Sequence, residues 1–455
     1  MARSADQAPA AAARVQRHAW LRAVFEDTLA RLDPAARTEA ALASLDVRAA
    51  RVVILAAGKA APAMTAGALR ILEARGLTVI GGVVIGVEAA RAHVLPPLRW
   101  HAASHPVPDH RSVHAAEAAL AIAMGAPADA EILALISGGA SALMAQPAPG
   151  ISLADKVATV RAVAASGADI HALNTVRKHL SAIKGGQLAA RAAASVTTLV
   201  ASDVIGDDLA AVASGPTVPD PTTFAQARAI VAAAMDWNAV PASVRAHLDA
   251  GCAGQRRDTP KHARPGDRAV LVAGTGALVH AAGDACRGRG ARVEIASSAL
   301  AGDVGQVAER IARAATRAED AAEAAAGNSG NGAGEGGARP RHVWIAGGEA
   351  TIALPPRPGV GGRAQHIALL LARALAGTRH VSVLVAGSDG IDGNSPAAGA
   401  IVDGHTWEAI RAAGHDPDGA LARCDAHVAL AAADAAICTG PTGVNHADIA
   451  VVAAG

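Results

Sequence analysis

Short apolar runs rich in valine, isoleucine and leucine alternate along this chain with longer alanine-rich stretches. The runs cover residues 51–57, 78–87, 131–136, 196–201, 269–273, 292–295, 342–346 and 380–386. Short β-branched runs that alternate with helical stretches are typical of βαβ units, in which helices cover both faces of a parallel sheet. The alternation therefore predicts an α/β fold with largely parallel sheets in Rossmann-like α/β/α layers.

The length of the chain indicates more than one domain. At about 100–200 residues per domain, 455 residues suggest two or three. Residues 251–267 are rich in glycine, proline and charge, which is typical of a linker. We therefore predict an N-terminal α/β domain over 1–250 and a C-terminal α/β domain over 268–455. The low-complexity stretch 328–340 should form a flexible surface loop within the second domain.

The composition excludes several kinds of binding site. The chain has no tyrosine, 2 phenylalanines and 5 tryptophans, so stacking on aromatic rings is disfavoured as a mode of recognition. Its 41 basic and 40 acidic residues give a net charge of +1, without the basic excess of a nucleic-acid binder. We expect no nucleic-acid partner and a ligand that is held by backbone amides, small side chains and charges.

The sequence favours a cytoplasmic protein. The 4 cysteines form no C-x-x-C pair, and they are interpreted as buried thiols in a reducing compartment. Arginines interrupt the N-terminal segment, so no secretory signal is expected. A charge-free stretch, 132–153, is broken by glycines and prolines, which argues against a membrane helix. We expect a monomer or a homodimer.

Polar loops follow the predicted strands, where open α/β sheets bind their ligands. Gly58 and Lys59 come after the first strand and could hold a phosphate at a helix N-terminus. This is not a Walker A loop, because Ala60 replaces the required serine or threonine. The loop Ser137-Gly138-Gly139-Ala140-Ser141 could form an anion nest from consecutive amides and two hydroxyls, or could be a tight packing turn.

Charged residues gather in two further segments of the first half. Asn174, Arg177 or Lys178, and Ser181 can share one helix face, which would suit an acidic substrate or would simply be a solvated face. Asp203, Asp207 and Asp208 follow another strand. They could hold Mg²⁺, or Asp203 could act as a general base, and Asp207 or Asp208 could cap a helix.

The second half repeats this pattern. Glu349 follows a strand and could contact a metal or a ribose hydroxyl, and Arg363 after Gly361 and Gly362 could bind a phosphate or carboxylate bidentately. Asp389 lies in a glycine-rich loop, 387–394, that does not meet the EF-hand register, so a nucleotide or Mg²⁺ role fits better than calcium. The loop 439–445 could bind a phosphate or a base edge.

Taken together, these motifs resemble the class II glycerate 2-kinases, the family that carries a MOFRL domain. The resemblance covers nearly the whole chain and keeps the order of the motifs. They occupy residues 58–61, 105–109, 137–141, 176–186, 202–207, 347–349, 361–363, 387–393 and 439–443. This chain departs from the family pattern at Ala364 and His366, where asparagine and glutamate are usual, at Ser388, where threonine is usual, and around His446 and Ala447.

The resemblance implies ATP- and Mg²⁺-dependent phosphorylation of D-glycerate to 2-phosphoglycerate, in a cleft between two α/β domains. It places Lys59 and Arg363 on the transferring phosphoryl group. With Asp203 these are the predicted catalytic residues.

The remaining site residues are predicted in three groups. Those for substrate or phosphate are Ser137, Gly138, Gly139, Ser141, Arg177 and Lys178. Those for nucleotide are Lys184, Glu349, Gly361, Gly362, Asp389, Thr439 and Thr442. Those for metal are Asp203, Asp207 and Asp389.

Two other functions remain open from the sequence. One is an NAD(P)H-dependent hydroxypyruvate reductase, a name also attached to this family. Its nearest dinucleotide fingerprint is Gly274-Thr275-Gly276, but Val279 occupies the position of the third glycine. The other is a non-catalytic protein that binds a small acid.

Overall fold

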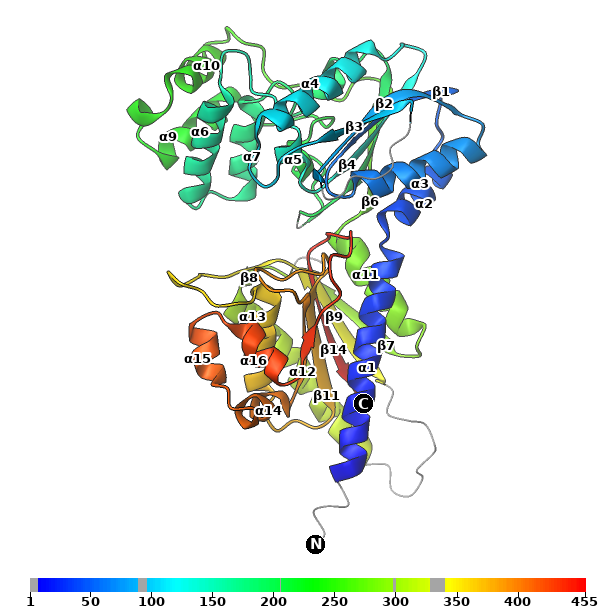
Figure 1. Ribbon diagram of the computed structural model, residues 1–455, viewed down its shortest axis with the longest axis vertical. Coiled ribbons are helices and arrows are strands. Elements are labelled where there is room, and N and C mark those ends of the chain that lie inside the picture. Colours follow the sequence, from blue (N-terminus) through cyan, green and yellow to red (C-terminus); the bar gives the residue numbers. More distant parts are fainter. Residues whose placement is uncertain (1–6, 89–95, 205, 298–299, 328–339) are drawn as a thin grey trace. The chain divides into compact units, whose positions relative to one another are not determined.

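The computed structural model describes residues 7–88, 96–204, 206–297, 300–327 and 340–455 (Figure 1). The chain forms two compact units. The first, Pro34–Ala273, is called the parallel-sheet unit below, and the second, Met1–Asp33 with Gly274–Gly455, the mixed-sheet unit. The predicted α/β class is confirmed in both.

The parallel-sheet unit is built on a six-stranded sheet whose neighbouring strands all run parallel. The strands are β1 (Arg51–Ala57), β2 (Thr78–Gly86), β3 (Leu98–Ala102), β4 (Glu131–Ser137), β5 (Ser195–Ala201) and β6 (Arg268–Ala273). Their order across the sheet is β3-β2-β1-β4-β5-β6. This is the doubly wound order, in which the winding reverses between β1 and β4.

Helices cover both faces of this sheet. Along β1, Val52 and Ile54 face a core with α2 (Pro34–Ser44) and α3 (Ala61–Ala74). Val53 and Leu55 face the opposite core, with α4 (His110–Gly125), α5 (Ala140–Leu143) and α8 (Gln187–Ala190). A strand buried on both faces needs apolar residues at every position, which explains the unbroken run at 51–57.

Four further helices form a separate helical lobe in the same unit (Figure 1). They are α6 (Leu153–Ala165), α7 (Ile170–His179), α9 (Phe224–Ala234) and α10 (Ala242–Cys252). Phe224 lies in their core together with Val163, Val176, Val231 and Leu248. Two 3-10 turns, η2 (Val212–Ser214) and η3 (Trp237–Ala239), lie on the connections.

The mixed-sheet unit contains a second six-stranded sheet, in the order β13-β12-β11-β14-β9-β7. Its strands are β7 (Arg292–Ser297), β9 (His342–Gly348), β11 (Val381–Gly387), β12 (Gly399–Asp403), β13 (Ala436–Ile437) and β14 (Asp448–Ala454). Only β7 and β9 pair in parallel, and the other four pairs are antiparallel. The expectation of largely parallel sheets therefore holds for the first unit but not for the second. Two short strands, β8 (Gly302–Asp303) and β10 (Ala350–Thr351), pair separately.

Helices also cover both faces of the mixed sheet. On one face pack α12 (Val304–Gly327), α13 (Arg363–Ala374), α14 (Thr406–Ala412), α15 (Pro417–Ala422) and α16 (Ala426–Ala432). On the other pack α1 (Gln7–Arg31) and α11 (Thr275–Arg287). Among the helices within the described ranges, none is long and apolar enough to cross a membrane.

The predicted domain bounds, 1–250 and 268–455, differ from the compact units at residues 1–33 and 251–273. Residues 251–267 do not separate the units, because side chains tie this segment to the parallel-sheet unit. His179 Nε2 lies 2.9 Å from Asp258 Oδ1, and the Val196 N–H in β5 donates to Asp267 Oδ1 at 2.9 Å. The predicted flexible loop, 328–340, lies outside the described residues except for Pro340.

Arg17 explains why helix α1 belongs to the mixed-sheet unit. Its side chain is 2% exposed. Its guanidinium donates to the backbone oxygens of Gly455 at 2.9 Å and Arg379 at 2.7 Å, and to Ser382 Oγ at 3.3 Å. One cation on α1 thus satisfies acceptors near β11 and at the last residue of the chain, 438 positions away.

We expect Arg17→Met to lower the free energy of unfolding by about 2–4 kcal/mol, because it leaves buried carbonyl groups without a donor. The exposed Arg22 on the same helix is the matched control, and Arg22→Ala should change stability by less than about 0.5 kcal/mol. Urea unfolding of both variants measures the difference. Equal stabilities would show that Arg17 does not anchor α1.

Candidate active site

The first candidate site lies where the winding of the parallel sheet reverses. Gly58 and Lys59 follow β1, and Ser137 and Gly138 lie at the end of β4. The Lys59 N–H donates to the Gly138 oxygen at 2.9 Å, and the Ala60 N–H donates to Ser137 Oγ at 3.0 Å. A β-carbon on Gly58 would lie 2.1 Å from Ser137 Oγ, so only glycine fits at that position. The predicted Lys59 loop and serine-glycine loop therefore contact each other.

Asp203, which follows β5, completes this group. A β-carbon on Gly138 would lie 2.1 Å from Asp203 Oδ2, so the carboxylate rests directly on the glycine. One on Gly139 would lie 3.3 Å from Lys59 Cγ and 3.2 Å from His105 Cδ2. Burial, and then the charge of Lys59, lower the pKa of His105. The exposed Lys59 and the half-buried Asp203 thus flank the same glycine pair.

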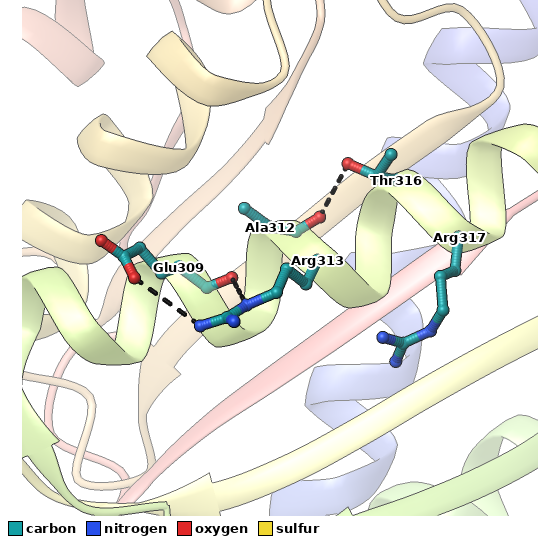
Figure 2. Close-up of a pocket in the computed structure, with 5 residues that line it drawn as sticks. All are labelled: Glu309, Ala312, Arg313, Thr316 and Arg317. Carbon is teal, nitrogen blue, oxygen red and sulfur yellow. Dashed lines mark hydrogen bonds and ion pairs between the residues drawn. The ribbon is translucent and has the colours of Figure 1, made fainter.

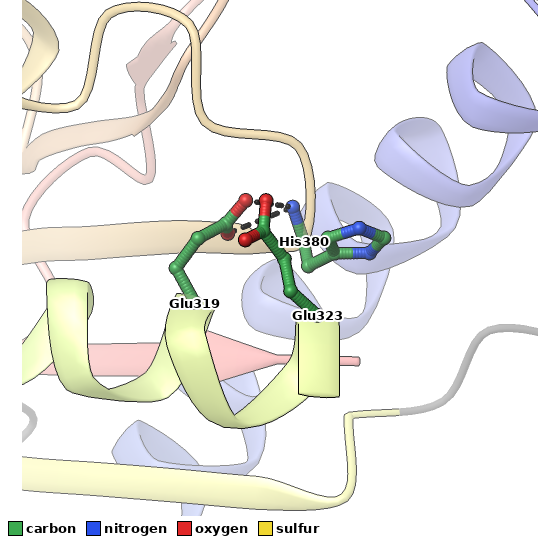
Figure 3. A group of neighbouring side chains, drawn as sticks. All are labelled: Glu319, Glu323 and His380. Carbon is green, nitrogen blue, oxygen red and sulfur yellow. Dashed lines mark hydrogen bonds between the residues drawn. The ribbon is translucent and has the colours of Figure 1, made fainter. Parts of the chain in front are cut away.

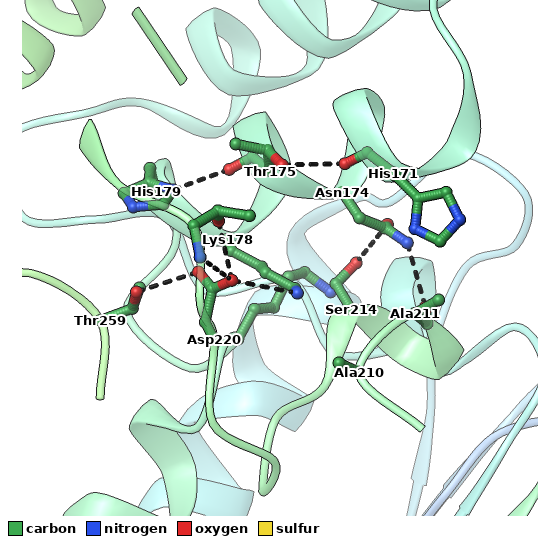
Figure 4. A network of polar contacts seen from close by, with 12 residues as sticks. His171, Asn174, Thr175, Lys178, His179, Ala210, Ala211, Ser214, Asp220 and Thr259 are labelled. Atoms are coloured by element: carbon green, nitrogen blue, oxygen red, sulfur yellow. Dashed lines mark hydrogen bonds and ion pairs between the residues drawn. The ribbon is translucent and has the colours of Figure 1, made fainter. Parts of the chain in front are cut away.

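A hydrogen-bonded chain continues from this loop into the helical lobe. Lys184 Nζ donates to the backbone oxygen of Ser141 at 2.7 Å and lies 2.9 Å from its Oγ. Ser141 Oγ lies 3.1 Å from Ser214 Oγ. Ser214 Oγ in turn donates to Asn174 Oδ1 at 2.9 Å (Figure 4). Arg177 NH1 reaches the same Asn174 oxygen at 3.4 Å. The predicted residues Ser141, Arg177 and Lys184 thus share one network.

Lys178, which was predicted together with Arg177 to bind substrate or phosphate, lies outside this network. Its Nζ lies 3.3 Å from Asp220 Oδ1 in a buried ion pair, and Asp220 also accepts from Thr259 Oγ1 at 2.9 Å (Figure 4). Burial opposes the charge of Asp220, but Lys178 and neighbouring hydroxyls outweigh it and lower its pKa. A structural partner therefore accounts for the charge of Lys178.

Lys156 is a buried cation that the sequence did not single out. It lies on α6, is 4% exposed, and donates to the backbone oxygen of Gln146 at 3.3 Å. Burial, and then the charge of Arg177, lower the pKa of Lys156 to about 7. Burial, Lys156 and Arg177 together hold the pKa of Lys184 well below its usual range. A lysine in an alanine-rich helix gives no sequence signal that separates burial from solvation.

The second candidate site lies in the mixed-sheet unit. Strand β14 runs antiparallel between β9 and β11, so its first residue, Asp448, pairs with Gly348 and Gly387 at the ends of those strands. Arg363, the first residue of α13, forms an ion pair with Glu349, and its Nε lies 3.8 Å from Asp448 Oδ2. A β-carbon on Gly387 would lie 3.2 Å from Asp448 Oδ1 and 3.3 Å from Asp389 Oδ1. The predicted residues Glu349, Arg363 and Asp389 therefore gather around Asp448.

Asp448 was missed because the site residues were predicted among residues that follow strands, as in a parallel sheet. Asp448 instead begins a strand that runs antiparallel to its neighbours. Its Oδ2 is buried and has no hydrogen-bond donor in the described part of the chain. Burial raises the pKa of Asp448 to about 7; the charge of Arg363 opposes this, and Asp392 and Glu349 add to it. Clustered carboxylate oxygens with an unsatisfied member form a donor set that fits a hard divalent cation. Of the predicted metal ligands, Asp389 lies here, and Asp203 and Asp207 belong to the other unit.

The glycine-rich entrance to α13 is already engaged within the protein. Asp392 accepts from the backbone N–H groups of Ala364 at 3.1 Å and Gln365 at 2.8 Å, and the Gly361 N–H donates to Asn394 Oδ1 at 2.9 Å. A β-carbon on Gly362 would lie 2.2 Å from Asp392 Oδ1. Gly361 and Gly362 therefore hold the turn that presents Arg363.

The loop 439–445, which contains Thr439 and Thr442, packs against the turn that carries Asp389. The Thr442 N–H donates to the backbone oxygen of Asp389 at 3.1 Å, and Thr442 Oγ1 donates to the backbone oxygen of Ser388 at 2.5 Å. Thr439 Oγ1 donates to the Gly440 oxygen at 2.9 Å. A β-carbon on Gly390 would lie 2.0 Å from the Gly440 oxygen, which explains the glycine there.

A hollow of about 390 Å³ lies against α13, where His366, three residues beyond Arg363, is part of its lining. Its wall includes residues 352–355, which continue from β10, together with the aliphatic side chains of Val304 and Leu421 and the ring of His366. His366 Nδ1 is buried without a hydrogen-bond partner in the described ranges. The lining is thus mainly aliphatic, and Asp303, His366 and Cys424 are its polar members.

Two other features of the mixed-sheet unit do not bring together side chains that would bind a ligand. A hollow of about 560 Å³ is lined by α12 alone, where Glu309 pairs with Arg313 at 3.6 Å and Thr316 donates to the Ala312 oxygen (Figure 2). Glu319, Glu323 and His380 come close enough to suggest a metal site (Figure 3). However, both Glu319 oxygens already accept backbone N–H groups, from Arg379 and His380, at the start of β11. Glu319 therefore holds the beginning of β11, and Asp448 lies beside the other end of that strand.

The fold and these sites define an α/β enzyme with two units, and comparisons identify its family. Residues 20–249 match a domain of unknown function (DUF4147), and residues 342–448 match the MOFRL family. The glycerate 2-kinase of Pyrococcus horikoshii is 34% identical over 408 residues, which are 88% of this chain and 87% of that protein. A putative hydroxypyruvate reductase of Agrobacterium vitis is 38% identical over 445 residues, 96% of this chain and 94% of that protein.

A solved structure agrees with these matches. The crystal structure of a glycerate kinase from Thermotoga maritima superposes with a TM-score of 0.84 at 30% identity, over 97% of this chain and 100% of that one. The chain belongs to the glycerate 2-kinase family, a family of kinases with a MOFRL region. The resemblance drawn from the motifs is confirmed.

We expect the stability of the ligand-free protein to depend on pH through Lys156. Its pKa is near 7 when folded and near 10.5 when unfolded, so the unfolded chain binds more protons between these values. The penalty for the buried charge is therefore full below about pH 7 and disappears as the pH rises towards 10.5. Urea unfolding should find Lys156→Met more stable than wild type at pH 7, with a smaller advantage at pH 9.5. An advantage that does not change with pH would contradict the burial of a charge at this position.

Proposed function

We propose that the protein is a glycerate 2-kinase, which transfers the γ-phosphoryl group of ATP to the 2-hydroxyl of D-glycerate. The observation that carries this proposal is the convergence of Lys59, the Ser137–Gly139 loop and Asp203 where the parallel sheet reverses its winding. Relatives named glycerate 2-kinase cover most of the chain. In phosphoryl transfer the protein mainly positions the reactants and stabilises charge.

We assign the acceptor to the parallel-sheet unit. Lys59 is exposed beyond the carboxyl end of the central strand β1, so its ammonium group is accessible to a transferring phosphoryl group. The amides and hydroxyls of residues 137–141 would bind an oxyanion. Asp203, which rests on Gly138, would orient the attacking hydroxyl or accept its proton.

We assign the nucleotide to the mixed-sheet unit. Glu349, Asp389 and Asp448 offer the oxygen donors that would hold Mg²⁺, which when bound neutralises phosphate charge. Arg363 would contact the transferring phosphoryl group through its guanidinium. The hollow lined by residues 352–355 and His366 would suit the nucleobase, because a chain with few aromatic residues must hold a base between aliphatic side chains. The interdomain cleft, the cytoplasmic location and the monomeric or homodimeric state stay predictions.

A reductase fits the structure less well. A dinucleotide fingerprint belongs in the first βα turn of the sheet, and here that turn is Gly58-Lys59-Ala60. Gly274 and Gly276 lie instead where the chain leaves β6 for α11, which belongs to the other compact unit. Absorbance at 340 nm with NAD(P)H and hydroxypyruvate tests this alternative.

We expect wild-type protein to release ADP from ATP and Mg²⁺ only when D-glycerate is present, with 2-phosphoglycerate identified by phosphorus NMR. Lys59→Ala should lower kcat about 10²–10³-fold, because it removes a charge that stabilises the transition state. The stability of this variant should stay within about 0.5 kcal/mol of wild type, since Lys59 is exposed.

Arg51 provides the matched control at the opposite end of the same strand. It forms an exposed ion pair with Asp129 at 3.2 Å, and Arg51→Ala should keep wild-type turnover. Equal rates for Lys59→Ala and wild type would remove Lys59 from the mechanism. Binding of D-glycerate without any ADP release would identify a binding protein instead of a kinase.

A further inference from the structure

Three cations lie buried together between α6, α7 and the loop that precedes α8. Lys156 is 4% exposed and Lys184 2% exposed, and Arg177 is half-buried on α7. The charges lie close enough that Arg177 lowers the pKa of both lysines. In all, the group brings up to three positive charges into the interior of the parallel-sheet unit.

Only neutral oxygens contact these cations within the described ranges. Lys156 donates to the Gln146 backbone oxygen, Lys184 to Ser141, and Arg177 to the Asn174 amide oxygen. Lys178 provides the contrast on the same helix, because it pairs with the buried carboxylate of Asp220. A buried charge that is not neutralised is strongly unfavourable, so an anion bound among the two buried lysines and the half-buried Arg177 would stabilise their charged forms.

The surroundings of the cations point in the same direction. Ser141 Oγ and Ser214 Oγ lie 3.1 Å apart next to Lys184, and Ser214 Oγ donates to Asn174 Oδ1, so an oxyanion there would take the place of bonds within this network. The backbone at Ala213 and Ser214 is left-handed, with φ of 55° and 60°, which is strained for residues other than glycine.

We propose that Lys156, Arg177 and Lys184, with the hydroxyls of Ser141 and Ser214, form the pocket that binds the carboxylate of the acceptor acid. The proposal rests on the proposed function for the identity of that acid, a small 2-hydroxy acid. It transfers Lys184 from the predicted nucleotide site to the acceptor site. It also separates two tasks, since the exposed Lys59 serves the phosphoryl group and the buried cations hold the carboxylate at the other end of the same loop.

The test measures thermal melting of the full chain without nucleotide, against D-glycerate, glycerol and inorganic phosphate. D-glycerate should raise the melting temperature of wild type, and glycerol, which lacks the carboxylate, should not. In Lys184→Met and Lys156→Met the apparent Kd for D-glycerate should rise about 10- to 100-fold, the loss expected for a hydrogen bond to a charged group. Arg228→Ala, which breaks an exposed ion pair on α9, should bind as wild type does.

Melting without ligand provides a second readout that does not depend on binding. Lys156→Met and Lys184→Met should melt at or above the wild-type temperature, because each removes an uncompensated buried charge. Lys178→Met should melt below it, because that change leaves Asp220 buried without its partner.

Two results would overturn the proposal. One is a Lys184→Met variant that melts below wild type and still binds D-glycerate with wild-type affinity. The other is a Lys184-dependent shift with inorganic phosphate but none with D-glycerate, which would assign the pocket to a phosphate group. The melting assay contains no ATP, so its result does not depend on turnover. A protein that binds D-glycerate through Lys184 in this assay but releases no ADP in the kinase assay would contradict the proposed kinase function and leave this pocket in place.

Discussion

The close approach of three loops at the reversal of the parallel sheet is the constraint on which the first site depends. Gly58 lies against Ser137 and Gly138 against Asp203, and neither position has room for a β-carbon. The glycines let the loops after β1 and β4 hydrogen-bond to each other and let Asp203, after β5, pack against Gly138. As a result Lys59 and Asp203 occupy fixed places on either side of one short turn, which a phosphoryl-transfer enzyme needs for positioning.

The two units bury opposite charges. The parallel-sheet unit buries Lys156 and Lys184 without carboxylate partners in the residues described, whereas the mixed-sheet unit places Asp448 among other carboxylates. Each arrangement is unfavourable in the ligand-free protein and becomes favourable when an ion of opposite charge binds. Under the proposed function, these charges would suit an acidic acceptor in one unit and a metal-bound nucleotide in the other.

The sequence predicted what depends on local pattern. Apolar runs located most strands of the parallel sheet, and the polar residues after them included Lys59, Ser137 and Asp203, which the structure brings together. Asp448 was missed because β14 is antiparallel, so the first residue of the strand lies at the site. Lys156 was missed because burial of a lysine depends on tertiary packing. The attachment of α1 through Arg17 joins residues hundreds of positions apart, which no local pattern reveals.

The central claim is that the buried lysines bind the carboxylate of the acceptor acid. Proton uptake on binding of D-glycerate tests this claim most directly. The measurement is calorimetry at pH 8 in two buffers that differ in ionisation enthalpy. Since burial and neighbouring cations hold the pKa values of Lys156 and Lys184 low, a bound carboxylate should raise them and draw protons from the buffer. We expect net uptake in wild type and less in Lys156→Met. Binding with no proton uptake in wild type would contradict the account.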